Sequence, residues 1–413
     1  MKLRNRHNMK LGSRRLILAA AGMMVVWLIG VALAAGAGQA GRGQAAPAGG
    51  QAAPAPPAAR GPVYPPGTQM SEQAFKNVTA LTGIPVDEFM DTMGLFSAAL
   101  SMCCAECHTG AGTDTVKWEL DTPRKVTARR MVRMVTAINR DNFNGRQVVT
   151  CWSCHRGRDR PVTTATIDTI YGTPTLEPDD VLPRAPTGPS VDDILNKYLQ
   201  AIGGAGPLAR LTSYVAKGTS VGFGGFSGGR PVEIYAKFPD QRATVIHTDD
   251  GDLTRVYDGR AGWIGTPLTA VKQFELVSSE LDGARVDAQM GFPGQIKQIL
   301  TNPRVSFSTT INDREVEVVQ GTGPRGLLIT LYFDKQSGLL VRSVRHANSM
   351  IGRVPLQIDY DDYRDVAGVK IPFKWVYAWV DGRDQFALTE VQPNVAIDAT
   401  KFGKPPLPTP RAR

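Results

Sequence analysis

The order of hydrophobic and polar residues divides the chain into segments of different kinds. Residues 16–35 are uncharged and almost wholly apolar, a run long enough for a helix that spans a bilayer and also compatible with the core of a signal peptide. Residues 36–68 are Gly, Ala, Pro and Gln almost throughout, a composition typical of an extended linker. Proline recurs again within residues 163–189. We therefore expect a signal peptide or membrane anchor at 1–35, two linkers, and folded domains at 69–162 and 190–405.

Helical periodicity marks the first folded segment. Pro85 precedes two acidic residues, which suit the first turn of a helix because the helix dipole favours negative charge there. Apolar residues then recur at helical spacing and form one stripe: Phe89, Met93, Phe96 and Leu100. A second helix is predicted to begin at Thr122–Pro123 and to end near Asn142–Gly145. On that helix one apolar face is predicted from Met131, Met134, Val135 and Ile138.

Strand-like alternation marks the second folded segment. Residues 190–204 predict an amphipathic helix with Ser190 as its N-cap and Gly203 at its C-terminus. After it come apolar–polar alternating runs, with hairpin turn signals at Asp258-Gly259 and Asp381-Gly382. This pattern predicts an antiparallel meander that is apolar and curved on one face. Trp375 and Trp379 fall on one strand face, where they are expected to line a core or a groove.

Charge changes this picture little. Lys and Arg number 47 against 38 Asp and Glu, a formal net charge of +9. Six of the basic residues stand before residue 41, with no acid among them. A basic flank before an apolar run keeps the N-terminus in the cytoplasm and directs the rest outward. The positive charge is therefore a topogenic signal, and no nucleic-acid-binding motif accompanies it.

The cysteines carry the chemistry. All five lie within residues 103–154, which is typical of a cofactor site rather than of a disulfide framework. Four of them form two C-x-x-C-H motifs, 104–108 and 151–155. Two thiols on one helical turn can bond the two vinyl groups of a haem, and the adjacent histidine can bind its iron. A zinc site or a redox dithiol is the alternative. We expect two covalent haems c, bound through Cys104, Cys107, Cys151 and Cys154, with His108 and His155 as proximal iron ligands.

Each iron then needs a sixth ligand. Of the remaining histidines, His7 precedes the apolar run, and His247 and His346 fall in strand-like runs of the other domain. Methionine is the available partner. Met93 and Met90 are the candidates before the first motif, and Met131 and Met134 are the candidates before the second. Each of these residues is also compatible with a role as core filler.

Two runs carry a family resemblance. VDEFMDTM…CCAECH followed by TARRMVRMVTAIN…VTCWSCHRG resembles one haem-pair module of the photosynthetic reaction-centre cytochrome c subunit family, over about residues 70–162. The resemblance implies an all-α multihaem cytochrome c module and selects Met93 and Met131 as the distal ligands. The tetrahaem members of that family carry two such modules, whereas this chain carries one. Here Cys103 also precedes the first motif, as a spare thiol or a small buried residue.

The resemblance implies a dihaem electron carrier rather than an enzyme. Such a protein exchanges electrons in the periplasm with a redox partner or a membrane complex, either anchored to the inner membrane or released after cleavage. A dihaem peroxidase-like enzyme is an alternative, because a methionine ligand can leave the iron. Arg156 and Arg158 are candidates to neutralise haem propionates and are equally compatible with ordinary surface charges.

The C-terminal part offers a further alternative. FDKQSGLLVR and IDYDDYRDVAGVKIPF make residues 190–405 similar to the antiparallel β half-barrels of the LolA/LppX-like superfamily. This resemblance implies a carrier or sensor of an apolar ligand or lipoprotein. We find no catalytic spacing in this part. Its acidic cluster, Asp359, Asp361 and Asp362, is expected to be a solvated turn, with a calcium site as the alternative.

Overall fold

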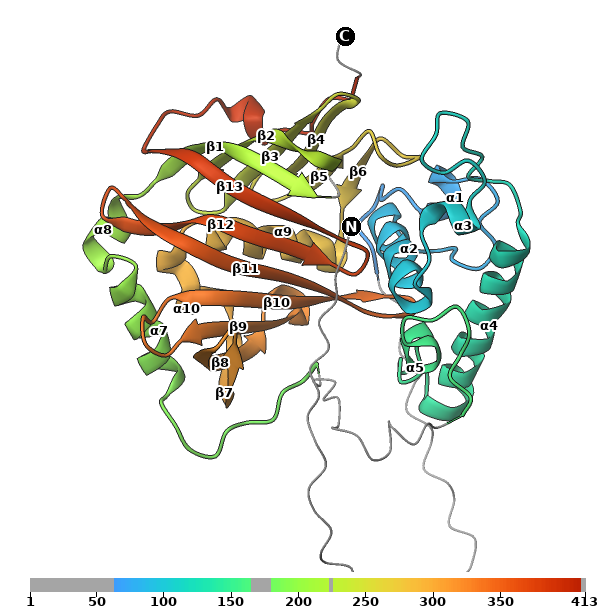
Figure 1. Ribbon diagram of the computed structural model, residues 1–413, viewed down its shortest axis with the longest axis horizontal. Coiled ribbons are helices and arrows are strands. Elements are labelled where there is room, and N and C mark those ends of the chain that lie inside the picture. Colours follow the sequence, from blue (N-terminus) through green and yellow to red (C-terminus); the bar gives the residue numbers. More distant parts are fainter. Residues whose placement is uncertain (1–62, 165–179, 223–225, 410–413) are drawn as a thin grey trace, which may run out of the picture. The chain divides into compact units, whose positions relative to one another are not determined.

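The fold is that of a computed structural model, which describes residues 63–164, 180–222 and 226–409 (Figure 1). The signal peptide or anchor predicted at 1–35 lies outside these residues, as do most of the linker 36–68 and the central part of the linker 163–189. Within the described ranges no helix is both long and apolar enough to cross a membrane.

Residues 71–155 form helices. They are α1 (Ser71–Ala74), α2 (Val86–Leu100), α3 (Cys104–Cys107), α4 (Pro123–Phe143) and α5 (Cys151–His155). The two longer helices confirm the periodicity in the sequence. Pro85 directly precedes α2, and Thr122 caps α4 because its hydroxyl oxygen accepts a hydrogen bond from the Lys125 amide at 3.3 Å. Each C-x-x-C motif forms its own short helical turn, as haem attachment would require.

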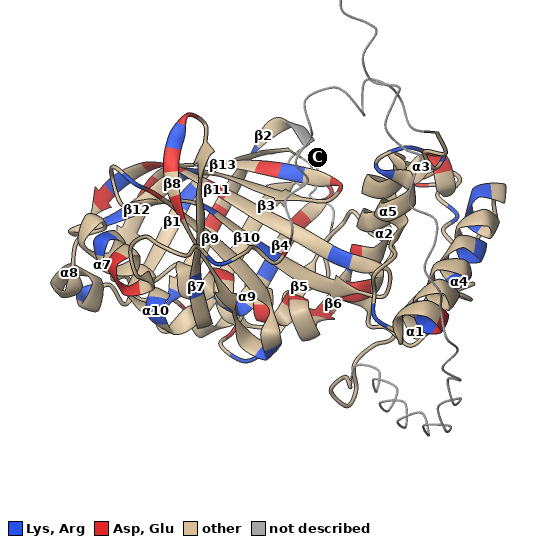
Figure 2. Ribbon diagram, turned by 90° about the horizontal axis from the view of Figure 1, so that it is seen from below, with Lys and Arg blue, Asp and Glu red and all other residues tan. Residues whose placement is uncertain are grey.

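The buried face of α4 differs from the predicted one. Val132, Val135 and Asn139 are buried, whereas Met134 is 43% exposed. The prediction counted apolar residues only. Asn139 is buried in place of Met134, because the Asn139 side chain forms hydrogen bonds with backbone groups of the loop that follows α4. Basic residues are spread along the more exposed part of α4, as the blue bands along it show (Figure 2).

The strands of the described residues form one antiparallel sheet. They are β1 (Ser213–Gly222), β2 (Phe226–Lys237), β3 (Gln241–Thr248), β4 (Gly251–Tyr257), β5 (Gly262–Gly265), β6 (Gln273–Leu276), β7 (Thr301–Ile311), β8 (Arg314–Thr322), β9 (Leu328–Asp334), β10 (Leu340–Ser349), β11 (Gly352–Val366), β12 (Val369–Trp379) and β13 (Gly382–Pro393). The predicted meander is confirmed, with hairpin turns at both Asp-Gly signals.

The strand order explains how the sheet curves around a core. Neighbours run β6-β5-β4-β3-β2-β1-β13-β12-β11-β10-β9-β8-β7, so the first and last strands pair at the centre and β6 and β7 lie at the edges. The chain crosses from one edge to the other through α9 (Ser278–Met290), η1 (Pro293–Gln295) and α10 (Ile296–Ile299). Helix α9 contacts β3, β4 and β10 and thus covers one face of the sheet (Figure 1).

Further helices complete the core on this face: α7 (Val191–Ala201), α8 (Ala205–Arg210) and η2 (Pro324–Gly326). On the other face of the sheet, η3 (Ala399–Phe402) packs Phe402 against Ala243 and Val256. Ser190 caps α7 as predicted, with its hydroxyl accepting from the Asp193 amide at 3.1 Å. The helix ends at Ala201, slightly before the predicted Gly203. Its inner face packs with Val286, Ile296 and Phe333 in the largest apolar cluster.

The acidic cluster at 359–362 is not a turn. These residues lie within β11, where Asp359 pairs with Arg342 across the strands and Asp362 pairs with Arg364 at 2.6 Å. Alternating Asp and Tyr fit an extended strand with one wet face, which the sequence interpretation missed. Across the described residues no group of acidic, histidine or cysteine side chains is arranged to hold a metal ion.

The helical and sheet segments share a core. The β10–β11 hairpin places Ile351, which is 2% exposed, among Leu81, Leu95, Val132 and Cys151. Two hydrogen bonds reinforce this contact: the Gln147 side chain donates to the Ser349 carbonyl at 2.6 Å, and the Val277 amide donates to Asp87 at 2.6 Å. The sheet segment therefore completes the packing around the helices that carry the cysteines.

Candidate haem-binding site

The first motif sits on α3, which is tied to the start of α4. The Cys103 amide donates to the Glu106 carboxylate at 2.9 Å and caps the turn. The Thr122 hydroxyl donates to the Cys107 carbonyl at 2.9 Å, and Arg124 forms an ion pair with Glu106 at 3.1 Å. Cys103 is exposed rather than buried.

A cavity of about 800 Å³ brings the predicted ligands of the first haem together. Met93, Cys104, Cys107 and His108 all line it, although they come from α2, from α3 and from the residue after α3. The apolar stripe of α2 faces the same space, since Phe89, Phe96 and Leu100 line it as well.

The polar groups of this cavity suit an iron porphyrin. His108 is half-buried, and its Nδ1 atom is buried without a hydrogen-bond partner. Burial, and then the nearby Lys125 ammonium, lower the pKa of His108, which keeps the imidazole neutral as a metal ligand must be. Burial also raises the pKa of Cys104 and of Cys107. A neutral imidazole, two thiols and a thioether in one apolar space are the donor set of a His/Met haem c.

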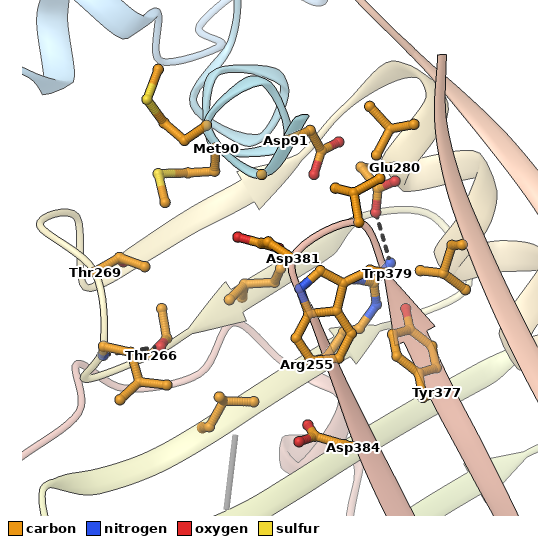
Figure 3. Close-up of a pocket in the computed structure, with 18 of the residues that line it drawn as sticks. Met90, Asp91, Arg255, Thr266, Thr269, Glu280, Tyr377, Trp379, Asp381 and Asp384 are labelled. Carbon is orange, nitrogen blue, oxygen red and sulfur yellow. Dashed lines mark hydrogen bonds and ion pairs between the residues drawn. The ribbon is translucent and has the colours of Figure 1, made fainter. Parts of the chain in front are cut away.

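The two candidate methionines of α2 have different surroundings. Met93 packs against the buried cluster that contains Leu81 and Cys151. Met90 lines the part of the cavity that the sheet encloses, near Asp91 and Asp381 (Figure 3). Met93 therefore lies on the side of α2 that belongs to the helical core, which favours it over Met90.

The second motif sits on α5, whose position depends on Asn139. The Asn139 side chain donates to the Val149 carbonyl at 2.7 Å and accepts from the Val148 and Val149 amides at 3.1 and 2.9 Å. These bonds hold the loop that enters α5. Thr150 then caps α5, since its hydroxyl accepts from the Ser153 amide at 3.3 Å.

His155 is oriented in the manner of a metal ligand. Its Nδ1 atom lies 2.9 Å from the Arg158 carbonyl, so the proton is held on Nδ1 and the Nε2 lone pair is left for a metal. Cys151 is buried and Cys154 is exposed. Arg156 and Arg158 are both exposed, which is compatible with either of their predicted roles.

The methionines of the second site lie on α4. Met131 is half-buried, whereas Met134 is largely exposed. Met131 does not line the cavity around the first motif. The structure therefore places the predicted ligands of the first haem around one cavity, whereas those of the second haem lie on α4 and α5 without a shared cavity among the described pockets. His247 and His346 lie on β3 and β10, as expected; His247 Nδ1 is 2.9 Å from Asp252.

The sheet encloses the other end of the cavity, and sequence reasoning missed that this end is continuous with the first motif. Its walls are mainly apolar and aromatic, and they include Trp375 and Trp379, as their shared strand face predicted. A charged cluster lies beside α2: Arg345 donates to Glu280 at 3.2 Å and to Asp287 at 3.3 Å, and Arg255 donates to Glu280 at 3.2 Å (Figure 3). The Arg345 side chain is 4% exposed and lies at an inward-facing position of its strand. A basic residue at an inward strand position was the sequence signal that could have revealed the charged cluster.

Asp381 links the two ends of the cavity. It lies at the β12–β13 turn, lines the cavity, and its charge contributes to the raised pKa of Cys104. A side chain at Gly94 would place its Cβ 3.0 Å from Val380 and 3.1 Å from Asp381, so the hairpin approaches α2 where glycine leaves room. Burial raises the pKa of Asp381, and a hydrogen bond from Trp379 opposes that rise.

No curated protein matches the sequence. Similar solved structures include a LolA superfamily protein from Nitrosomonas europaea, 12% identical over 52% of this chain and 99% of its own, with a TM-score of 0.37. The lipoprotein LppX from Mycobacterium tuberculosis is 15% identical over 51% of this chain and 100% of its own, with a TM-score of 0.21. The resemblance predicted from the two cysteine motifs is confirmed, because residues 35–174 match the model of the family described as photosynthetic reaction centre cytochrome C subunit.

Proposed function

We propose that this protein is a dihaem c-type cytochrome that carries electrons in the periplasm to or from a membrane electron-transfer complex. The observation that carries the proposal is the convergence of Met93, Cys104, Cys107 and His108 on one cavity. The family match of residues 35–174, which contain both motifs, supports the same function.

Cys104, Cys107 and His108 would hold one haem, with Met93 on the other side of the iron. Cys151, Cys154, His155 and Met131 would hold the second. Haem c supplies a one-electron couple whose potential a methionine ligand raises relative to a second histidine. The protein's part is to fix the ligands and to exclude water, and the apolar stripe of α2 does the latter at the first site.

Helix α2 would connect the two sites. Met93 and Phe96 face the first site, while Leu95 and Ala99 pack in the same cluster as Cys151 of the second. The second motif therefore packs against α2, and the first motif lines the same cavity as α2. This arrangement favours an electron carrier over a peroxidase-like enzyme, because both irons would have a methionine partner close by. Carbon monoxide binding to the reduced protein separates these two functions: a carrier should bind little.

Haem stoichiometry tests the proposal. The full chain, expressed in a host that attaches haem c, should carry two haems that survive denaturation. Replacing Cys104 and Cys107 together by Ser should leave one haem, and replacing Cys151 and Cys154 should do the same. Cys103→Ser is the matched control and should leave both, because Cys103 lies outside both C-x-x-C-H motifs and serine keeps the amide bond to Glu106. A wild-type protein without haem would refute the proposal.

A further inference from the structure

None of the predicted haem ligands comes from the sheet, yet the sheet end of the cavity is continuous with the first attachment site. Residues from both segments line the one space, including Cys104 and His108 at one end and Ile246 and Phe386 at the other. The whole space, the first attachment site included, has a volume of about 800 Å³, within the range of sites that enclose small organic molecules. The inward faces of β3, β12 and β13 make the sheet end mainly apolar, with Arg242 and Asp384 as charged exceptions.

The aromatic walls are flat and preorganised. Trp375 stacks on Phe386, with ring centroids 4.9 Å apart and planes at 11°. Trp379 lies in the cavity beside α2, between Asp381 and Arg255 (Figure 3). Such surfaces favour a planar ring, because stacked aromatic contacts add to the free energy gained by burying apolar area.

The charges beside α2 argue against an anionic group at that end. Arg255 and Arg345 are both taken up by the carboxylates of Glu280 and Asp287, at 3.2 to 3.3 Å. Asp91 and Asp381 line the same end and add acidic groups rather than cations. An uncharged headgroup with hydrogen-bonding oxygens meets this balanced cluster without leaving a charge unpaired.

We propose that this end of the cavity binds a quinone-class amphiphile, with its planar, uncharged ring between Trp379 and α2 and its tail along the apolar strands. Only one part of this inference rests on the proposed function: the choice of a redox-active ring rather than another planar headgroup. It deepens that function by naming the class of small molecule that would sit beside the first attachment site.

Calorimetric titration of the full, haem-loaded chain with an oxidised benzoquinone that bears a decyl tail tests the site without turnover. We expect one saturable site with Kd on the order of 1 μM. Decanol and decanoate have the same tail and probe the headgroup. Both should bind more weakly than the quinone, decanol because it lacks the ring and decanoate because the cations beside α2 are already paired with carboxylates.

A matched pair of variants on β3 localises the site. Thr244 lines the cavity, and Val245, the next residue, faces the other side of the sheet. Thr244→Phe fills the space and should weaken quinone binding about tenfold, whereas Val245→Phe should leave it unchanged. Thermal unfolding of both variants checks that they fold. If Thr244→Phe does not fold, the smaller substitution Thr244→Leu takes its place.

The outcomes separate this inference from the proposed function. No saturable quinone binding, equal affinity of the two β3 variants, or tighter binding of decanoate would overturn the inference even if two haems are present. Quinone binding that Thr244→Phe weakens supports the site even if the haem assay fails, and in that case only the proposed function is lost.

Discussion

Met93 and Met90 are three residues apart on α2, yet their side chains have different neighbours. Met93 packs in the helical core beside the cysteine motifs, whereas Met90 faces the sheet end of the cavity. We expect Met93→Ala to open the first iron, so that the reduced protein gains a carbon monoxide complex at one haem. Met90→Ala is the matched control and should leave the spectrum unchanged. If only Met90→Ala opens the iron, the ligand assignment passes to Met90.

Single residues were predictable where the chemistry is local and not where tertiary contact decides. The C-x-x-C-H motifs nominate their own ligands through spacing along one helical turn, and each motif does form such a turn, while the ligand assignment stays a prediction. Arg345 was not identified, since its acceptors come from a helix about sixty residues away in the sequence. Cys103 was expected to be buried in one interpretation and is exposed, because the sequence does not show which side of a short turn faces solvent.

At the scale of elements, α9 shows how a glycine can be needed inside a helix. A Cβ at Gly283 would lie 2.2 Å from Arg345 Nη1, so the guanidinium rests against the helix backbone only because that side chain is absent. We expect Gly283→Ala to lower the free energy of unfolding by about 1–3 kcal/mol, because it displaces a buried cation from its acceptors. Urea unfolding measures the change.

The control for this variant is another helical glycine. Gly206 in α8 has only ordinary contact, with Arg210 Nη1 at 3.5 Å from the added Cβ. Alanine there should change stability by less than about 1 kcal/mol, because its helix propensity is offset by the restriction that Pro207 places on the residue before it. Equal effects of the two substitutions would show that contact with Arg345 is not what requires Gly283.

The β10–β11 hairpin tests whether the helices depend on the sheet. Ile351 at its tip is buried among residues of α2 and α4 and beside Cys151. Ile351→Ala should destabilise the protein by about 2–4 kcal/mol through the cavity that it leaves. Leu407→Ala, at a site 63% exposed, should change stability little. Thermal unfolding compares them, and similar melting temperatures would count against a shared core.

Elements were predicted well where caps and periodicity coincide. Ser190 and Thr122 began helices as expected because an N-cap acts on its own first turn. The face of α4 was wrong at Met134, because the loop that Asn139 holds could not be foreseen from apolar spacing. The pairing of β1 with β13 could not be predicted either, because two strands so far apart along the chain leave no local sequence pattern.

At the scale of the whole molecule, the contact between helices and sheet contains a buried acid. Asp87 is 3% exposed and accepts the Val277 amide at 2.6 Å and the Glu88 amide at 2.9 Å. Its pKa is raised to about 8, mainly by burial and in part by the charges of Glu280 and Glu88, while the two hydrogen bonds oppose the rise. Burial likewise raises the pKa of Glu88 and of Asp381. The folded protein therefore holds protons that the unfolded chain has released.

This difference fixes the sign of the pH dependence. A carboxyl group whose pKa is 3.8 when unfolded and about 8 when folded makes the folded state bind the extra proton between those values, so stability falls as pH rises from about 4 to about 8. Asp87→Asn removes one such group and should flatten the fall by a few kcal/mol at most. Asp313→Asn, on the β7–β8 turn, should leave the slope intact. Urea unfolding at pH 5 and pH 8 measures the slope of each protein, and an unchanged slope in Asp87→Asn would place the titrating groups elsewhere.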